Sequence, residues 1–375
     1  MYKSGSLNRR RFVKLAGMTA LAARPGMLRA SGAASVEQDR FAFVGAAGTG
    51  VHVYATNGKT WRLRQIVASE APVSLALHNS GRWLYVLNGV SEHQGLPCGS
   101  VETYAVDAKS GRLDLLGRRG LSLSATMPRH LTVSPDGLTV MVAVHGGGAY
   151  NLLPILVDGS VGRVTGILKE TGCGPVAEHQ DAAHPQATLF DTTGRRVIAT
   201  DLGSDRISVL SLEQGLEVAA RYEMPGGSGP RHLALHPAGH LLYVGNALDG
   251  ALSAFSYDAN TGTITDRLWQ MHSSSCEAMA MDPAGKFLYT ASRDAVTMWR
   301  IESANGDLHR LDSQDAASIG HVHGLMMNPD GRKLALLTDL GVAEMTSAES
   351  ERLGEPLLMA PVARARCIAT IGNRV

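Results

Sequence analysis

The 375-residue sequence is poor in charge and almost balanced in sign. Charged residues make up 18% and hydrophobic residues 44%, which excludes a disordered polyelectrolyte and allows a sizeable core. The formal net charge is +1, so no globally basic surface indicates a nucleic-acid partner. The four cysteines have no Cys-x-x-Cys spacing, which argues against the usual zinc site, and nothing in the sequence pairs them.

Several catalytic motifs are missing as well. There is no Gly-x-Ser-x-Gly turn, so a serine hydrolase has no support. The glycine run at residues 146–148 lacks the lysine and the hydroxyl residue of a phosphate-binding loop. No regular spacing of carboxylates and histidines marks a metal site, and we expect neither a metal nor another cofactor.

The N-terminus carries a short basic and apolar pattern. Residues 8–14 read Asn-Arg-Arg-Arg-Phe-Val-Lys and precede an apolar run at 15–23, with small residues at 30–34. This pattern is typical of a twin-arginine signal peptide, which predicts that residues 1–34 are removed after a transient contact with the export machinery. The alternative is a chance basic arm. The run is shorter than the roughly 20 residues of a spanning helix, so we expect no stable membrane anchor and a periplasmic location.

Glycine is abundant, and its positions follow a repeat. The 42 glycines and 15 prolines indicate many tight turns and few long helices. Six segments share a short apolar stretch that ends at a turn glycine; these glycines are Gly81, Gly137, Gly194, Gly239, Gly285 and Gly331. Each is followed by further β-compatible stretches. Three or four short strands per repeat of about 45 residues are typical of a β-propeller blade.

The repeat predicts the complete architecture. The first module, residues 41–66, has the later strands of a blade but no leading segment. The apolar stretch at 367–371 supplies a candidate for the missing strand, which would close the ring and remove an open sheet edge. We therefore predict an all-β protein over residues 35–375, a seven-bladed β-propeller whose closing blade is split between the two ends of the chain.

The start of each innermost strand is predicted to open onto the central channel. Five of the 14 histidines fall near these starts, two of them beside Arg129 and Arg231. A lone histidine is more often structural, whereas five that converge on one channel favour a polar pocket. These histidines are His130, His184, His232, His321 and His323. Long insertions at 89–99 and 166–183 are candidates for lids over one mouth of the channel.

The modules resemble the seven-bladed β-propeller lactonase family. The most specific marks are residues 229–237 (GPRHLALHP), 128–131 (PRHL), 201–206 (DLGSDR) and 287–289 (FLY), and the resemblance covers the chain from Phe41 onward. It implies a sugar-lactone hydrolase of the 6-phosphogluconolactonase type, with no nucleic-acid partner. The alternatives are a propeller that binds a ligand or partner without catalysis and a muconate cyclase-type lyase.

The resemblance also implies site residues. Gln180, His184, Arg231 and Arg293 match positions of the family pattern, whereas His179 replaces an arginine, Gln186 a second histidine and Ala247 an acidic residue. Lactone hydrolysis needs a base for water and a group that stabilises the oxyanion. The predicted catalytic residues are His184 as base, His179 as its substitute, and Arg231 and Arg293 as clamps for the oxyanion or a substrate anion. The predicted substrate-binding residues are Gln180, His130, His232 and His323.

The predicted export determines which lactones the enzyme would meet. Phosphogluconolactone arises inside the cell, so an exported enzyme would meet unphosphorylated aldonolactones such as gluconolactone. Residues 1–34 hold seven of the basic residues and none of the acidic ones, which leaves 28 basic against 34 acidic residues in the remaining chain. An acidic body strengthens the exclusion of nucleic acid and makes channel arginines a local positive feature.

Overall fold

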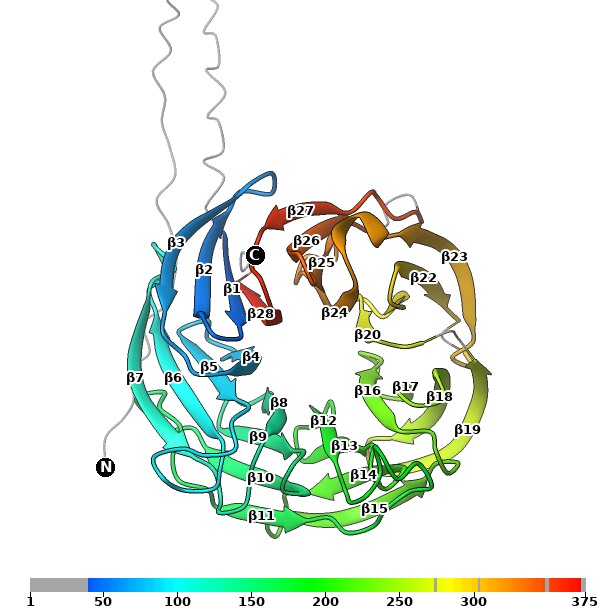
Figure 1. Ribbon diagram of the computed structural model, residues 1–375. Helices are drawn as coiled ribbons and strands as arrows, with labels where there is room; N and C mark the ends of the chain where they lie inside the picture. Colours follow the sequence, from blue (N-terminus) through cyan, green and yellow to red (C-terminus); the bar gives the residue numbers. More distant parts are fainter. Residues whose placement is uncertain (1–39, 273–274, 303, 348–350, 372–375) are drawn as a thin grey trace, which may run out of the picture. The chain divides into compact units, whose positions relative to one another are not determined.

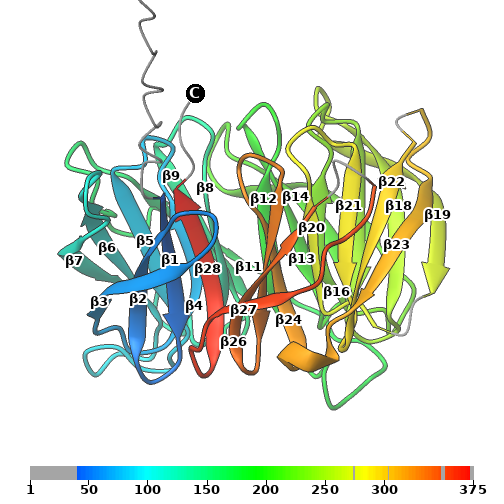
Figure 2. The same cartoon turned by 90° about the horizontal axis from the view of Figure 1, so that it is seen from above.

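The computed structural model describes residues 40–272, 275–302, 304–347 and 351–371. The predicted signal peptide lies outside the described residues. Seven four-stranded antiparallel sheets stand around a central channel, and the innermost strands run roughly along the axis of the ring (Figures 1 and 2). The prediction of an all-β, seven-bladed propeller is confirmed. Among the described residues, no helix is long and apolar enough to cross a membrane.

Within each blade, the strands succeed one another from the channel to the outer wall. From inside to outside, blade 1 contains β28 (Ala365–Ile371), β1 (Arg40–Ala46), β2 (Gly50–Thr56) and β3 (Trp61–Val67). Blade 2 contains β4 (Pro72–Leu77), β5 (Trp83–Asn88), β6 (Ser100–Val106) and β7 (Leu113–Gly120). Blade 3 contains β8 (Pro128–Val133), β9 (Thr139–Val144), β10 (Ala149–Pro154) and β11 (Gly166–Lys169).

The other four blades follow the same order. Blade 4 contains β12 (Pro185–Phe190), β13 (Arg196–Asp201), β14 (Arg206–Ser211) and β15 (Glu217–Glu223). Blade 5 contains β16 (Pro230–Leu235), β17 (Leu241–Asn246), β18 (Ala251–Asp258) and β19 (Thr263–His272). Blade 6 contains β20 (Ala278–Met281), β21 (Phe287–Ala291), β22 (Ala295–Ile301) and β23 (Leu308–Asp315). Blade 7 contains β24 (Val322–Met327), β25 (Lys333–Thr338), β26 (Gly341–Thr346) and β27 (Leu357–Ala360), and the short 3-10 helix η1 (Ala317–Ile319) precedes it.

The repeated glycines close the turn between the first and second strand of their blades. All six have φ between 69° and 77°, a region that glycine adopts without a steric penalty. The second strand that follows is buried on both faces, as in β17, where every residue is buried. The outermost strands alternate instead, as β15 does, because one of their faces meets solvent.

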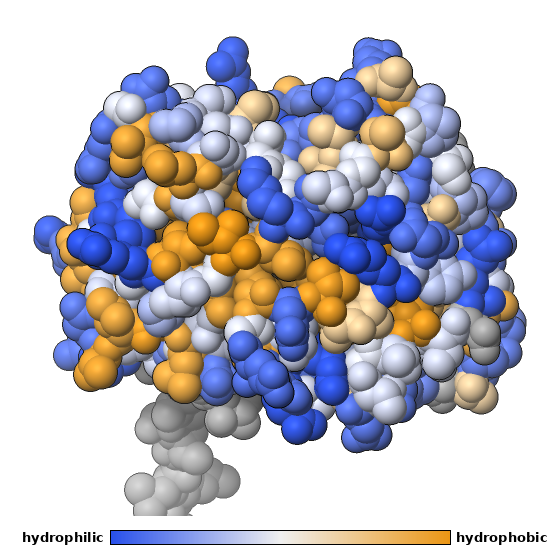
Figure 3. Space-filling view, turned by 90° about the horizontal axis from the view of Figure 1, so that it is seen from below, coloured by the Kyte–Doolittle hydropathy of each residue, from blue (hydrophilic) through white to orange (hydrophobic). Residues whose placement is uncertain are grey.

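The core consists of apolar clusters between neighbouring blades. The cluster between blades 2 and 3 includes Tyr85, Leu87, Val142 and Val144, all fully buried. The Tyr85 hydroxyl donates a hydrogen bond of 3.0 Å to the carbonyl of Gly159, so a polar contact also links these two blades. On the outer wall, exposed apolar side chains lie among hydrophilic ones, in a band across the face seen in Figure 3.

The ring closes as the repeat predicts. Strand β28 pairs antiparallel with β1 from Phe41↔Ile371 to Ala46↔Ala365, so the last described strand completes the first blade. The closing strand is also the innermost strand of its blade. The C-terminal end of the described chain therefore forms a wall of the central channel, and the N-terminal strand β1 lies directly behind it.

Candidate active site

The innermost strands begin with a shared irregularity. In six of the seven blades, their pairing with the second strand slips by one residue near the same mouth of the channel, which is a β-bulge. The residues left without a partner are Val73, Arg129, Gln186, Arg231, His323 and Arg366. In blade 6, Glu277 precedes the strand at the corresponding place. A bulge redirects a side chain, and here all seven line one cavity.

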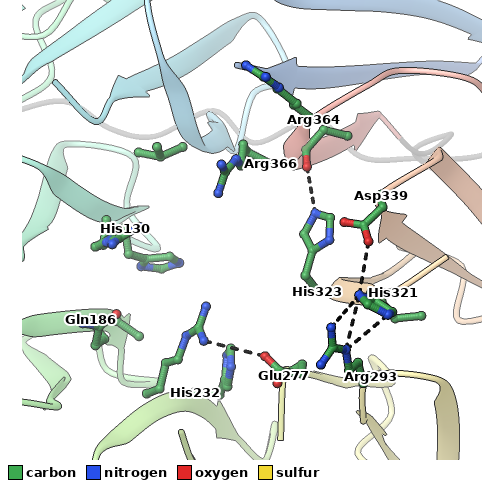
Figure 4. Close-up of a pocket in the computed structure, with 16 residues that line it drawn as sticks. His130, Gln186, His232, Glu277, Arg293, His321, His323, Asp339, Arg364 and Arg366 are labelled. Atoms are coloured by element: carbon green, nitrogen blue, oxygen red, sulfur yellow. Dashed lines mark hydrogen bonds and ion pairs between the residues drawn. The ribbon is translucent and has the colours of Figure 1, made fainter. Parts of the chain in front are cut away.

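This cavity, which we call the funnel, has a volume of about 570 Å³ and lies at the channel mouth (Figure 4). Besides the seven residues above, polar side chains from the neighbouring strand starts and turns line it. They are His130, His232, Arg293, His321, Asp339 and Arg364. The funnel therefore contains five arginines and two carboxylates, on a protein whose predicted mature chain is acidic.

Part of the positive charge of the funnel is not balanced by a carboxylate. Arg231 lies 3.9 Å from the Glu277 carboxylate. Within the described part of the chain, neither Arg129 nor Arg366 forms an ion pair or a side-chain hydrogen bond. Burial and the neighbouring charges of Arg231 and Arg366 lower the pKa of Arg129. An arginine cluster of this kind attracts an anion or an oxygen that acquires negative charge.

Histidines beside the arginines are held neutral. Burial lowers the pKa of His130 to about 4. Burial, Arg231 and His130 lower the pKa of His232 to about 3. The Thr188 backbone N–H lies 3.3 Å from Nδ1 of His130, so this nitrogen accepts and Nε2 carries the proton. A neutral imidazole with its proton on Nε2, as in His130, can donate to an oxygen without adding charge.

His323 has the arrangement expected of a general base. Its Nε2 lies 2.8 Å from the carbonyl oxygen of Ala365 on β28. Because a carbonyl oxygen only accepts, Nε2 carries the proton, and the neutral ring keeps a lone pair on Nδ1. His323 lies at the funnel wall, and Figure 4 shows it between Arg366 and the His321 cluster.

The wall formed by blades 6 and 7 holds an exposed ionic cluster. The Arg293 Nε lies 3.3 and 3.2 Å from the two ring nitrogens of His321, which places the guanidinium over the ring face. Asp339 is 3.3 Å from Nδ1 of His321, and Asp294 is 3.9 Å from Nε2. These carboxylates offset part of the positive charge of Arg293, unlike the situation of Arg129.

A second cavity of about 350 Å³, which we call the recess, opens beside the funnel. The two cavities share Arg129, Gln186 and Arg231. The recess is lined further by the insertion at 166–183 and by the ends of β9, β13 and β17. Those residues are His145, Glu178, His179, His184, Leu202, Ala247 and Leu248.

Within the recess, two histidine rings are stacked. The rings of His145 and His184 have centroids 4.3 Å apart and an interplanar angle of 21°. Gln186 Nε2 donates to Nδ1 of His145 at 2.8 Å, which leaves the proton of His145 on Nε2. Burial and the positive charge of Arg129 lower the pKa of His145 to about 4.

The Asp-Leu-Gly motif at residues 201–203 positions this wall. The Asp201 carboxylate accepts from the backbone N–H groups of His184, Gly203 and Ser204 at 2.7, 2.9 and 3.2 Å. A Cβ at Gly203 would meet the Ala182 carbonyl oxygen at 1.8 Å, so only glycine permits this approach. The motif therefore fixes the backbone at the start of β12.

A comparison with known families decides the identity. The sequence profile described as "Lactonase, 7-bladed beta-propeller" matches residues 41–337. The chain belongs to the seven-bladed β-propeller lactonase family. The family resemblance and the prediction of a lactone-hydrolysing enzyme are thereby confirmed.

Three relatives of this lactonase illustrate the likeness. The 6-phosphogluconolactonase of Formosa agariphila is 25% identical over 306 residues, covering 76% of this chain and 84% of that protein. The 6-phosphogluconolactonase of Bacillus subtilis is 28% identical over 222 residues, covering 56% of this chain and 62% of that protein. The structure of the Pseudomonas aeruginosa periplasmic gluconolactonase matches with a TM-score of 0.79 at 22% identity, covering 89% of this chain and 99% of that chain.

The structure places most of the predicted site residues of the lactonase at the two cavities. Arg231, Arg293, His130, His232 and His323 line the funnel, whereas His179 and His184 line the recess. Their individual roles remain predictions. The insertion at 166–183 contributes to the recess, whereas residues 89–99 line neither cavity.

Gln180 requires a correction. It is fully buried and lines neither cavity, so contact with substrate is not open to it. Its Nε2 donates to the Leu202 carbonyl at 2.8 Å, and its Oε1 accepts from the Val176 N–H at 3.1 Å. The side chain braces the insertion against the end of β13.

The role predicted for His184 does not fit its contacts. Its Nε2 lies 2.7 Å from the Asp181 carboxylate, and its Nδ1 lies 3.2 Å from the His145 carbonyl oxygen. Both partners only accept hydrogen bonds, so both ring nitrogens are engaged within the protein. His323, for which only Nε2 has such a partner among the described residues, is better placed to take a proton from water.

Some residues at the cavities were not among the predicted site residues. The strand-start pattern would have found Arg366 if it had been applied to the closing strand at 367–371. The same pattern marks Glu277 at the strand start of blade 6. His145 and Asp339 follow second strands instead, and no repeat position draws attention to them. They lie at the mouth because antiparallel pairing brings the end of the second strand of a blade beside the start of its innermost strand.

Proposed function

We propose that this lactonase hydrolyses unphosphorylated aldonolactones in the periplasm, with His323 as general base and the Arg129–Arg231 pair as the oxyanion clamp. The observation that carries the proposal is the funnel itself. It combines Arg129, which no carboxylate of the described residues pairs, with its neighbour Arg231, a neutral histidine donor, and one histidine whose lone pair is left free by a backbone hydrogen bond. A lactone supplies the developing oxyanion and the hydroxyls, and solvent supplies the attacking water, that these three groups need.

The reaction follows from these groups. Water attacks the ring carbonyl carbon while Nδ1 of His323 takes its proton, and the carbonyl oxygen becomes an oxyanion beside the guanidinium groups. The tetrahedral intermediate then collapses, and the bond from the carbonyl carbon to the ring oxygen breaks. The imidazolium returns the proton to that oxygen, which becomes a hydroxyl of the aldonic acid. His130, whose proton is on Nε2, donates to a substrate hydroxyl throughout.

Export supports the unphosphorylated substrate. Residues 8–14 match a twin-arginine signal, and the structural neighbour from Pseudomonas aeruginosa is described as a periplasmic gluconolactonase. Fractionation of cells that produce the full chain tests this part. The wild type is expected in the periplasmic fraction, and an Arg9→Lys/Arg10→Lys variant in the cytoplasm. An equal distribution of the two would refute export by this route.

Kinetics test the substrate and the base. Hydrolysis of glucono-lactone and of its 6-phosphate by the purified mature protein is followed by acid release, against spontaneous opening. We expect a higher kcat/KM for the unphosphorylated lactone. His323→Gln should lower kcat by roughly 10²–10⁴-fold, the contribution typical of general base catalysis. His309→Gln, an exposed histidine on β23, is the matched control. No acceleration of either lactone would overturn the hydrolase assignment.

A further inference from the structure

Gln186 occupies the bulge position of blade 4, between the bulge positions of blades 3 and 5, which carry Arg129 and Arg231. All three side chains line both the funnel and the recess. The proposed reaction uses the two arginines as the oxyanion clamp and gives Gln186 no role. A polar side chain between the two members of the clamp therefore remains to be explained.

Two hydrogen bonds decide which way the Gln186 amide faces. Its Nε2 lies 2.8 Å from Nδ1 of His145 and 3.3 Å from the carbonyl oxygen of His184. A backbone carbonyl only accepts, so the atom beside it is the amide nitrogen, and both of its protons are engaged. Oε1 has no hydrogen-bond partner among the described residues, and it is not enclosed by them. This side chain therefore offers a free acceptor to a ligand in the cavities.

The strand that carries this amide is bonded to both neighbouring blades at the level of the bulge. Thr200, which is fully buried, accepts from the Ala187 N–H at 3.2 Å and donates to the Arg231 carbonyl at 3.3 Å. On the other side, the Thr188 N–H donates to Nδ1 of His130 in blade 3 at 3.3 Å. The acceptor is thus held in place before a substrate binds, which avoids the cost of ordering it.

An aldonolactone presents a group that suits this acceptor. The carbon next to its ring carbonyl carries a hydroxyl group, so a carbonyl oxygen held between Arg129 and Arg231 brings this hydroxyl close to the same arginines. An arginine has donors but no acceptor, whereas Oε1 of Gln186 can receive the hydroxyl proton. Figure 4 shows His323 on the other side of the funnel from Gln186, so the attacking water and this hydroxyl take different places.

We propose that Gln186 selects lactones with a hydroxyl group next to the carbonyl, because its Oε1 accepts a hydrogen bond from that hydroxyl. The reaction that supplies such substrates is oxidation of an aldose at its anomeric carbon, and lactones that lack this hydroxyl are poor substrates. An amide suits the position because a carboxylate there would offset the charge of the clamp. This inference rests on the proposed function, since it assumes that the lactone carbonyl lies between the two arginines.

The test compares two lactones that differ only in this hydroxyl, glucono-lactone and 2-deoxyglucono-lactone. The kcat/KM of each is divided by its rate of spontaneous opening, which removes the inductive effect of the hydroxyl. We expect the wild type to favour glucono-lactone by roughly five- to tenfold, the effect of one hydrogen bond. Gln186→Leu has no acceptor and should abolish this preference. Gln214→Leu, at an exposed glutamine that lines neither cavity, is the matched control and should retain it.

A second variant separates substrate contact from support of His145. Gln186→Glu keeps an acceptor, so the preference should persist, while kcat for both lactones falls because the new charge offsets the clamp. If Gln186→Leu does not fold, as judged by circular dichroism, Gln186→Met takes its place. A side chain that only holds His145 would affect both lactones equally when it is replaced.

The outcomes distinguish failure of this inference from failure of the proposed function. A wild type without the preference, an equal loss for both lactones in Gln186→Leu, or a preference lost in Gln186→Glu overturns the inference while the proposed function stands. If neither lactone is hydrolysed, the proposed function fails, and calorimetry with gluconate and 2-deoxygluconate decides. Tighter binding of gluconate that Gln186→Leu removes and Gln214→Leu retains supports the contact, and equal binding of the two acids by the wild type overturns it.

Discussion

At the channel mouth, small differences in position along the chain separate residues with different tasks. The bulge position places Arg129, Arg231 and His323 in the funnel. The next position holds His130 and the one after Arg231 holds His232, both buried enough to stay neutral. Two residues before the bulge lie His184 and His321, which meet carboxylates instead. One repeated strand start thus presents ion-paired, cavity-lining and neutral buried side chains within four residues of one another.

The crowding of arginines should cost stability and serve activity. Arg129→Met removes a charge repelled by Arg231 and Arg366, so the free energy of unfolding should rise by about 0.5–1 kcal/mol. Loss of an oxyanion donor should lower kcat by roughly 10²–10³-fold. Urea unfolding measures the free energy of unfolding, and lactone kinetics measure kcat. Arg195→Met, at an exposed arginine 4.0 Å from Glu213, should alter neither by more than about 0.5 kcal/mol. A destabilised Arg129→Met protein would contradict this account.

Neutral buried histidines predict a pH dependence of stability. His232 has a pKa of about 3 in the folded protein against 6.5 in the unfolded chain, so between these values only the unfolded chain binds the proton. The free energy of unfolding should therefore fall as the pH falls from 6.5 towards 3. His232→Gln should reduce that slope by up to about 1.4 kcal/mol per pH unit, measured by urea unfolding at pH 4.5–7.5. His309→Gln should leave it unchanged, and an equal slope in His232→Gln would refute the assignment.

At the scale of strands and loops, the repeat was predictable from the sequence and the bulges were not. The turn glycines mark each blade because a positive φ strongly favours that residue. A one-residue slip in pairing changes neither composition nor periodicity, so the sequence places these residues at the strand starts and only the register shows the bulge that turns them into the funnel. For Gln180, the sequence instead indicates a substrate contact that the structure does not contain. Its motif indicates substrate contact, but packing of the insertion buries its amide among backbone groups.

The brace at Gln180 carries its own prediction. Gln180→Ala leaves the Leu202 carbonyl and the Val176 N–H without their partner, which should lower the free energy of unfolding by about 1–3 kcal/mol. Because the recess wall loosens while the funnel remains, KM for the lactone should rise more than kcat falls. Gln214→Ala, at an exposed glutamine, is the control. A stable variant with wild-type KM would show that the brace has no such role.

For the whole molecule, closure of the ring and construction of the funnel depend on the same strand. β28 pairs with β1, contributes Arg366, and supplies the Ala365 carbonyl that orients His323. Truncation after Arg364 should therefore leave blade 1 without its inner strand and expose an open edge. We expect the truncated chain to aggregate or to lose its cooperative thermal unfolding transition. Size-exclusion chromatography measures the aggregation, and circular dichroism measures the transition. A soluble, cooperatively folded truncation would contradict the importance of closure.

The split blade also sets the time at which the enzyme becomes active. Its strand β1 is among the earliest parts of the propeller to be synthesised and β28 is the last, so the ring stays open until β28 has been made. A prematurely terminated chain then lacks both Arg366 and the fixed tautomer of His323. Under the proposed mechanism, such a chain should be inactive rather than a weakened catalyst. The proposed activity therefore depends on synthesis of the whole propeller, because β28 must pair with β1 before the funnel is complete.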